Sequence, residues 1–166
     1  MIIERSKQYQ DLEGMATTVV CAMFFENKCL IAHLGDSRAY ILHDQKLVQL
    51  TEDHSLVNEL VKRGEISADE AKHHPQKNIV TRTLGISESV SLDFDELILG
   101  SGDKVMLCSD GLTNMVDDDV IEKVLQKDES LDDQCQELIA KANENGGNDN
   151  ITVLLADFSS KDGDMP

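Results

Sequence analysis

Three aspartates in this sequence share a local setting that suits a cation-binding site. Asp36 follows a glycine at the end of an apolar segment, and Asp110 lies between another apolar segment and Gly111. Asp149 lies in a stretch of glycine and asparagine that precedes a third apolar segment. Strand ends can bring such carboxylates together, and converging carboxylates repel one another unless a cation or a proton intervenes. Because hard oxygen ligands suit magnesium or manganese rather than zinc, the pattern predicts a Mg²⁺ or Mn²⁺ site.

A second interpretation of the same aspartates requires no ligand. An aspartate beside glycine is typical of turns, where its carboxylate accepts a hydrogen bond from the nearby backbone. The sequence by itself leaves both interpretations open. Three other polar residues are weaker candidates. His33 is typical of a core histidine, and Arg38 could bind a phosphate or pair with an acid. His54 could cap the helix predicted at Leu56 or contact a substrate.

Hydrophobic periodicity and turn residues predict the elements that would position these side chains. Segments rich in apolar and β-branched residues predict strands at residues 17–25, 29–34, 38–42, 47–51, 90–94, 104–109 and 151–158. Helical spacing predicts helices from Leu56, after Ser67 with Glu70 completing a capping box, behind the 117–119 aspartates, and after Ser130. Closely spaced strands favour antiparallel pairing. With no repeat and no linker, we expect one α+β domain over residues 1–166, an antiparallel β-sandwich flanked by helices.

Composition and missing motifs exclude several function classes. Lysine and arginine total 15 and aspartate and glutamate total 32, so the formal charge is −17. Such acidity argues against nucleic acid or an anionic membrane surface as a partner. No Cys-x5-Arg, Gly-x-Ser-x-Gly or P-loop motif occurs, which argues against cysteine phosphatases, common serine hydrolases and P-loop enzymes.

The cysteines and the two ends of the chain predict a cellular location. Four cysteines lie far apart without a Cys-x-x-Cys pair, which is typical of buried thiols in a reducing cytoplasm. The first residues lack the pattern of a secretory signal. Residues 159–166 are expected to form a polar tail. We therefore expect a cytoplasmic protein.

Six motifs occur in an order that resembles a known family. They are Gly14–Thr18, Ala32–Tyr40, Leu50–Ser55, Thr81–Gly85, Leu107–Leu112 and Asn148–Thr152. Together they resemble the metal-dependent protein phosphatases of the 2C type (the PPM family), in particular the short bacterial members. The similarity extends from about Gly14 to Phe158, which is nearly the whole chain.

The resemblance implies a fold, a reaction and a set of ligands. It implies paired antiparallel sheets flanked by helices, with Mn²⁺ or Mg²⁺ ions, two or more, at one end. Asp110 and Asp149 would bind the catalytic metal pair, and Asp36 would bind a further ion shared with Asp110. The family hydrolyses phosphoserine and phosphothreonine by metal-activated water, so we expect phosphorylated protein substrates of a serine/threonine kinase. Residues 56–78 would form a flap beside the active site.

The sequence departs from the family pattern at its start. Family members carry an Arg-x-x-Asn-Glu-Asp element and an Asp-Gly-x-Gly-Gly element, whose aspartate bridges the catalytic metals. Neither element occurs in this sequence. The chain is therefore expected to be the C-terminal portion of such a domain. The alternative is an impaired fragment or a non-catalytic acidic binding or regulatory module on the same fold.

Overall fold

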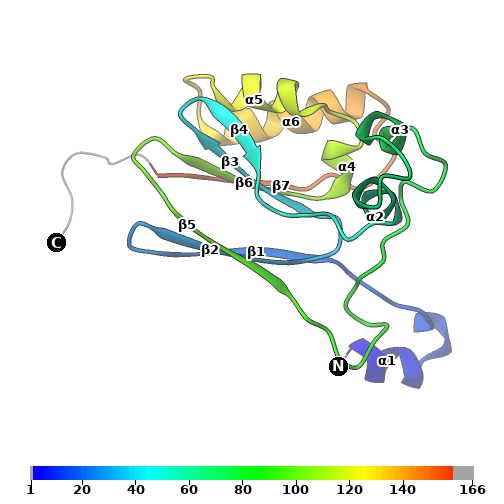
Figure 1. Ribbon diagram of the computed structural model, residues 1–166. Helices are drawn as coiled ribbons and strands as arrows, with labels where there is room; N and C mark the ends of the chain where they lie inside the picture. The colour runs from blue at the N-terminus through cyan, green and yellow to red at the C-terminus, as the bar shows by residue number, and fades with distance from the viewer. Residues whose placement is uncertain (1, 159–166) are drawn as a thin grey trace. The chain divides into compact units, whose positions relative to one another are not determined.

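The structure, a computed structural model, describes residues 2–158 (Figure 1). These residues form two compact units, which are described separately. The first unit comprises residues 2–21, 32–37 and 52–94, and the second comprises residues 22–31, 38–51 and 95–158. The prediction that residues 1–166 form a single domain stays a prediction. The tail expected at 159–166 lies outside the described residues.

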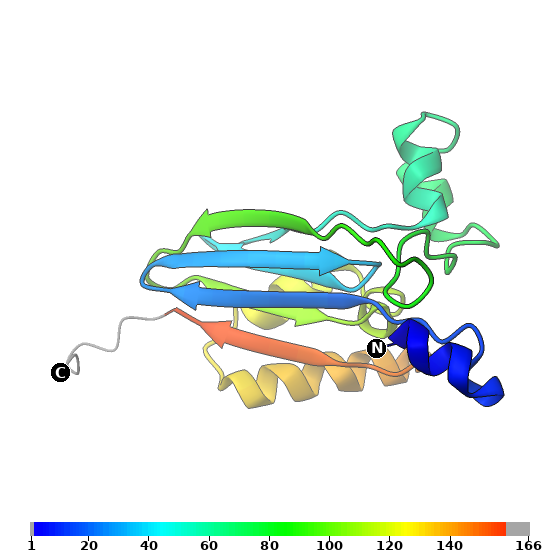
Figure 2. The same ribbon diagram turned by 90° about the horizontal axis from the view of Figure 1, so that it is seen from below.

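The strands form a three-stranded and a four-stranded sheet within residues 2–158. The three-stranded sheet has the order β1-β2-β5, which Figure 2 shows face-on. Its strands are β1 (Val19–Phe25), β2 (Lys28–Leu34) and β5 (Asp93–Ile98). The four-stranded sheet has the order β4-β3-β6-β7. Its strands are β3 (Arg38–His43), β4 (Lys46–Gln49), β6 (Lys104–Cys108) and β7 (Val153–Asp157). Antiparallel sheets flanked by helices confirm the α+β fold class.

The helices of the first unit begin at the residues that local sequence favours. They are α1 (Ile2–Gln8), a 3-10 helix (Gln10–Leu12), α2 (Leu56–Lys62) and α3 (Ala68–Lys72). The predicted capping box of α3 is confirmed, because Ser67 and Glu70 each bond the other's backbone N–H. The cap of α2 is Ser55, whose hydroxyl accepts from the Asn58 N–H. The suggestion that His54 caps α2 is therefore wrong.

The helices of the second unit cover one face of the four-stranded sheet (Figure 1). They are α4 (Asp110–Thr113), α5 (Asp118–Leu125) and α6 (Leu131–Glu144). The predicted cap Ser130 is confirmed, because its hydroxyl accepts from the Asp133 N–H. Their apolar side chains bury a core with those of β3 and β6. That core contains Tyr40, Leu42, Met106, Cys108, Leu112, Val116, Ile121, Val124, Leu125, Leu138 and Ala142.

Two elements differ from the expectation. The strand predicted at 90–94 lies further along the chain, at Asp93–Ile98, where strict apolar alternation no longer holds and the large side chains of Phe94 and Ile98 are exposed. The helix α4 was missed, since a single turn of four residues carries no readable periodicity. Asp110 therefore begins a helix rather than ending a strand.

We expect Leu138→Ala to lower the free energy of unfolding by about 2–5 kcal/mol, because it removes a fully buried side chain and leaves a cavity. Leu154→Ala is the matched control, since Leu154 is 52% exposed and should change stability far less. Urea unfolding followed by circular dichroism measures both. Equal losses in the two variants would contradict the assignment of this core.

Candidate metal centre and histidine cluster

Strand pairing in the four-stranded sheet brings three segments to one edge of the sheet, the edge at which these strands begin or end. Arg38 pairs with Cys108 across β3 and β6, and Cys108 pairs with Val153 across β6 and β7. The start of β3, the end of β6 and the start of β7 therefore lie at the same edge. Asp110 follows β6 by two residues and Asp149 precedes β7 by four. Both aspartates accordingly lie at this edge, Asp110 as the first residue of α4 and Asp149 in the loop before β7.

Close packing joins the loop of Asp110 to the loop of Asp149. The Ser109 hydroxyl donates to the Asn150 carbonyl at 3.0 Å and accepts from the Thr152 N–H at 3.0 Å. A Cβ added at Gly111 would lie 2.3 Å from the Asn150 carbonyl oxygen, so only glycine allows the two backbones this approach. The residues flanking Asp110 thus hold the segment that follows Asp149.

The electrostatics of Asp110 fit a cation ligand. Its carboxylate is half-buried and accepts from the Asn114 amide at 3.1 Å. Burial, followed by the neighbouring charge of Asp149, raises the pKa of the Asp110 carboxyl above its usual value. A divalent cation bound between the two carboxylates would offset both effects, and oxygen ligands of this kind are those that Mg²⁺ and Mn²⁺ prefer.

Asp149 combines the two interpretations drawn from the sequence. Its Oδ1 accepts from the Asn150 N–H at 2.7 Å, as a turn aspartate does. Its charge nevertheless acts on Asp110. A carboxylate has two oxygens, so a turn hydrogen bond does not prevent it from binding a cation.

Arg38 lies at the same sheet edge and joins a network that sequence reasoning missed. Its guanidinium donates to the Tyr40 hydroxyl at 2.9 Å, and that hydroxyl donates to Asp118 Oδ1 at 3.1 Å. Burial raises the pKa of the Tyr40 hydroxyl well above its usual value, so it keeps its proton. The arginine charge also favours ionised Asp110. The signal was the i, i+2 spacing of Arg38 and Tyr40, which places both on one face of β3.

Asp36 lies in the first unit, in the turn between β2 and β3. The structure brings Asp110 and Asp149 together in the second unit, and Asp36 is described with its own neighbours. It is half-buried, and both adjacent residues are held by other segments. The Gly35 N–H donates to His54 Nδ1 at 3.0 Å, and the Ser37 and Thr18 hydroxyls bond at 2.9 Å.

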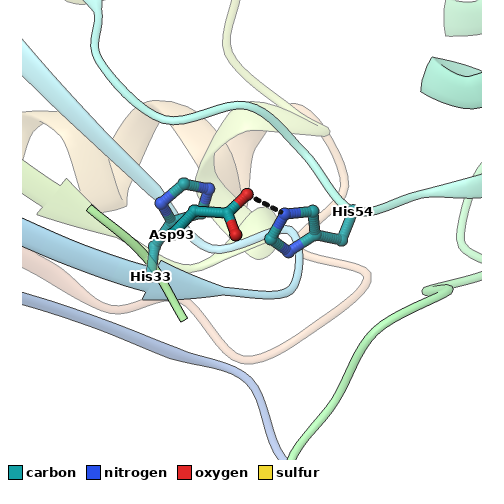
Figure 3. A group of neighbouring side chains, drawn as sticks. All are labelled: His33, His54 and Asp93. Carbon is teal, nitrogen blue, oxygen red and sulfur yellow. Dashed lines mark hydrogen bonds and ion pairs between the residues drawn. The ribbon is translucent and has the colours of Figure 1, made fainter. Parts of the chain in front are cut away.

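A buried histidine cluster in the first unit was not predicted. Figure 3 shows the Asp93 carboxylate directed at the ring of His54, with His33 beside them. The two imidazoles stack with centroids 5.0 Å apart and planes inclined by 7°. His54 Nε2 lies 3.0 Å from Asp93 Oδ2. One atom each from His33, His54 and Asp93 lies within 4.8 Å of the others, which is a separation that a metal ion could bridge.

Opposing effects act on the pKa values in this cluster. Burial is the largest effect on the pKa of His54 and lowers it. The Arg82 guanidinium, hydrogen-bonded to Asp93, holds the pKa of that carboxyl well below its usual range. His54 is therefore neutral and Asp93 ionised near pH 7. No sequence signal predicts this pairing, because Arg82 lies outside any helix or strand and Asp93 begins β5, so no regular periodicity relates the two.

Similarity to known proteins covers almost the whole chain. The family model described as protein phosphatase 2C matches residues 2–156. The serine/threonine phosphatase stp of Listeria monocytogenes is 46% identical over 156 residues, which cover 94% of this chain and 62% of that protein. The protein phosphatase PhpP of Streptococcus pneumoniae is 42% identical, covering 96% of this chain and 65% of its own length. This chain thus spans less than two thirds of these relatives.

Solved structures show the same relationship. The serine/threonine phosphatase Stp1 from Staphylococcus aureus superposes with a TM-score of 0.92 at 39% identity, over 96% of this chain and 63% of that one. The catalytic domain of the phosphatase PstP, solved in complex with two manganese ions, gives a TM-score of 0.87 at 35% identity, over 96% of this chain and 66% of that one. The chain belongs to the protein phosphatase 2C family of metal-dependent serine/threonine phosphatases.

Proposed function

We propose that this chain contributes metal ligands to a protein phosphatase that hydrolyses phosphoserine and phosphothreonine. The single observation that carries the proposal is the half-buried Asp110 carboxylate beside the charge of Asp149. We further propose that Asp110 and Asp149 bind a catalytic pair of Mn²⁺ or Mg²⁺ ions and that Asp36 binds an additional ion. The relatives named as serine/threonine phosphatases, from Listeria monocytogenes and Staphylococcus aureus, support this reaction.

Residues of this chain have distinct roles in the proposed reaction. When bound, divalent cations lower the pKa of water and offset negative charge on a phosphoryl group. Asp110 and Asp149 hold the cations, and the amide of Asn114 orients the Asp110 carboxylate. Tyr40 and Asp118 restrain the Arg38 guanidinium near Asp110, which adds a fixed positive charge at the site.

The substrates and the setting follow from the same proposal. We propose phosphorylated proteins, modified by a serine/threonine kinase, as the substrates. Residues 56–78, which contain α2 and α3, would act as a flap of a single phosphatase domain. All four cysteines lie within residues 2–158, and none of them is joined to another by a disulfide, which supports a cytoplasmic location. Within residues 2–158, no helix has the length and apolar composition needed to cross a membrane.

A non-catalytic binding module is the second candidate. The observation that favours it is the acidity of the sequence, whose formal charge is −17. Metal-dependent turnover separates the two functions, because a binding module would bind cations or phosphopeptides without hydrolysis.

We expect Asp110→Asn to reduce manganese-dependent hydrolysis of a phosphothreonine peptide by about 100-fold or more, because an amide cannot supply the anionic ligand. Phosphate release measures the rate, and calorimetric titration with Mn²⁺ measures binding. Asp128→Asn is the control, since Asp128 is exposed and lies outside the site. Binding without turnover in the unsubstituted chain would favour the binding module, and equal rates in all three proteins would refute the role of Asp110.

We expect Gly111→Ala to weaken Mn²⁺ binding by about 10-fold or more, because its Cβ would push the Asn150 backbone, and with it Asp149, away from Asp110. Gly100→Ala is the control, since a Cβ there meets its nearest atom at an ordinary 3.6 Å. Calorimetric titration compares the two variants. An unchanged affinity in Gly111→Ala would contradict the shared site.

A further inference from the structure

We propose that Arg82, Asp93 and His54 form a hydrogen-bonded chain that fixes the Gly35 peptide and so orients Asp36. His54 is a positioning residue in this proposal. The assignment rests on the proposed function to the extent that Asp36 is a metal ligand. All the residues involved belong to the first unit.

The hydrogen-bonded chain begins with two hydrogen bonds between Arg82 and Asp93. The guanidinium donates from Nη2 to Asp93 Oδ1 at 2.9 Å and from Nη1 to Oδ2 at 3.0 Å. It also donates from Nη2 to the Ser91 carbonyl at 2.6 Å. Two hydrogen bonds between a planar guanidinium and a planar carboxylate fix the orientation of one group relative to the other. The Asp93 carboxylate is therefore held in place to receive a further donor.

Hydrogen-bond donors around His54 determine its tautomer. The Gly35 N–H can only donate, so Nδ1, which lies 3.0 Å from it, must carry a lone pair. A neutral ring then carries its proton on Nε2, which donates to Asp93 Oδ2. The opposite tautomer would let Nε2 accept from Arg82 Nη1, which lies 2.6 Å away and can only donate. It would, however, direct the Nε2 lone pair at Asp93 Oδ2 and leave the buried Gly35 N–H without an acceptor. The Nε2–H tautomer is therefore favoured.

The same reasoning argues against a metal ion in the histidine cluster. A cation bound by His54 Nε2 would require that nitrogen to lose its proton while Nδ1 still accepts from Gly35. The ring would then be an imidazolate anion. The nearby Arg82 guanidinium already neutralises Asp93. The cluster is thus better described as a hydrogen-bonded chain than as a metal site.

His33 supports the ring of His54 from one side. Its Nε2 lies 3.0 Å from the Glu52 carbonyl, which can only accept, so Nε2 carries the proton. The Nδ1 of His33 therefore has a lone pair, which finds no hydrogen-bond partner among the described residues. The parallel stack and the burial of both rings, 2% and 8% exposed, restrict the rotation of His54.

The turn that carries Asp36 is held on both sides. His54 closes two hydrogen bonds with Gly35, because its own N–H also donates to the Gly35 carbonyl at 2.9 Å. Gly35 has a φ of +109°, and a Cβ there would lie 2.3 Å from Thr18 Cγ2. The Thr18 hydroxyl in turn bonds that of Ser37 at 2.9 Å. Asp36 therefore lies between two anchored neighbours, and the side chain of His54 is the anchor that connects it to Arg82.

Nuclear magnetic resonance of the unsubstituted chain tests the tautomer directly. We expect long-range ¹H–¹⁵N spectra at pH 7 to show His54 with a protonated Nε2 and an unprotonated Nδ1. A ring protonated on Nδ1, alone or in addition to Nε2, would overturn the proposal. This measurement needs neither metal nor turnover, so it is independent of the proposed function.

Two substitutions of His54 test the positioning role. The side-chain oxygen of His54→Asn lies near the place of Nδ1 and can still accept from Gly35, whereas His54→Leu offers no acceptor. We expect the Gly35 amide to exchange with solvent about 10-fold faster in His54→Leu and at nearly the normal rate in His54→Asn. His73→Asn is the control, because His73 is an exposed histidine of the same unit.

Manganese binding near Asp36 provides the second measurement on these variants. Substitution of residues that orient metal ligands lowers metal affinity by about 10–100-fold. We expect Mn²⁺ affinity to fall by this amount in His54→Leu but not in His54→Asn. The broadening of the Asp36 resonances by Mn²⁺ measures this affinity. Equal behaviour of the two variants in amide exchange would overturn the positioning role. If Mn²⁺ leaves Asp36 unaffected in the unsubstituted chain, the proposed ligand role of Asp36 fails, while the amide exchange still decides the role of His54.

Discussion

The second unit depends on the register of β6, which pairs with β3 on one side and β7 on the other. This pairing aligns Arg38, Cys108 and Val153 across the sheet. The alignment in turn determines which loops meet at the edge, and therefore which charges meet. The apolar side chains of α4, α5 and α6 cover the same sheet and keep its central strands buried. The candidate metal centre is thus a consequence of strand pairing between segments more than 40 residues apart in sequence.

The charges at this sheet edge offset one another only in part. Asp110 is half-buried beside Asp149, an arrangement that costs free energy when both carboxylates are ionised. Arg38 offsets only part of this cost, and Tyr40 and Asp118 restrain its side chain. Most of the other aspartates among residues 2–158 are exposed, as Asp149 itself is, whereas Asp110 is half-buried. A divalent cation bound between the two carboxylates would offset this cost.

The first unit holds in place a turn that requires glycine. Gly35 adopts a positive φ and packs against Thr18, and its two backbone groups are both bonded by His54. The imidazole can do this because its Nε2–H donates a hydrogen bond to Asp93, and because Arg82 keeps Asp93 ionised. A neutral histidine in this environment acts as a rigid connector between backbone and ion pair.

Features that form within a few residues could be predicted from the amino-acid sequence. The capping box of Ser67 and Glu70, the cap at Ser130 and the family motifs around Asp36, Asp110 and Asp149 were all readable, because helix caps and turns close over three or four positions. Only the tertiary structure decided that Asp110 meets Asp149, that Ser55 rather than His54 caps α2, and that His54 links Asp93 to Gly35. These contacts depend on strand register and on hydrogen-bond donors supplied by distant segments, and hydrophobic periodicity carries no information about either.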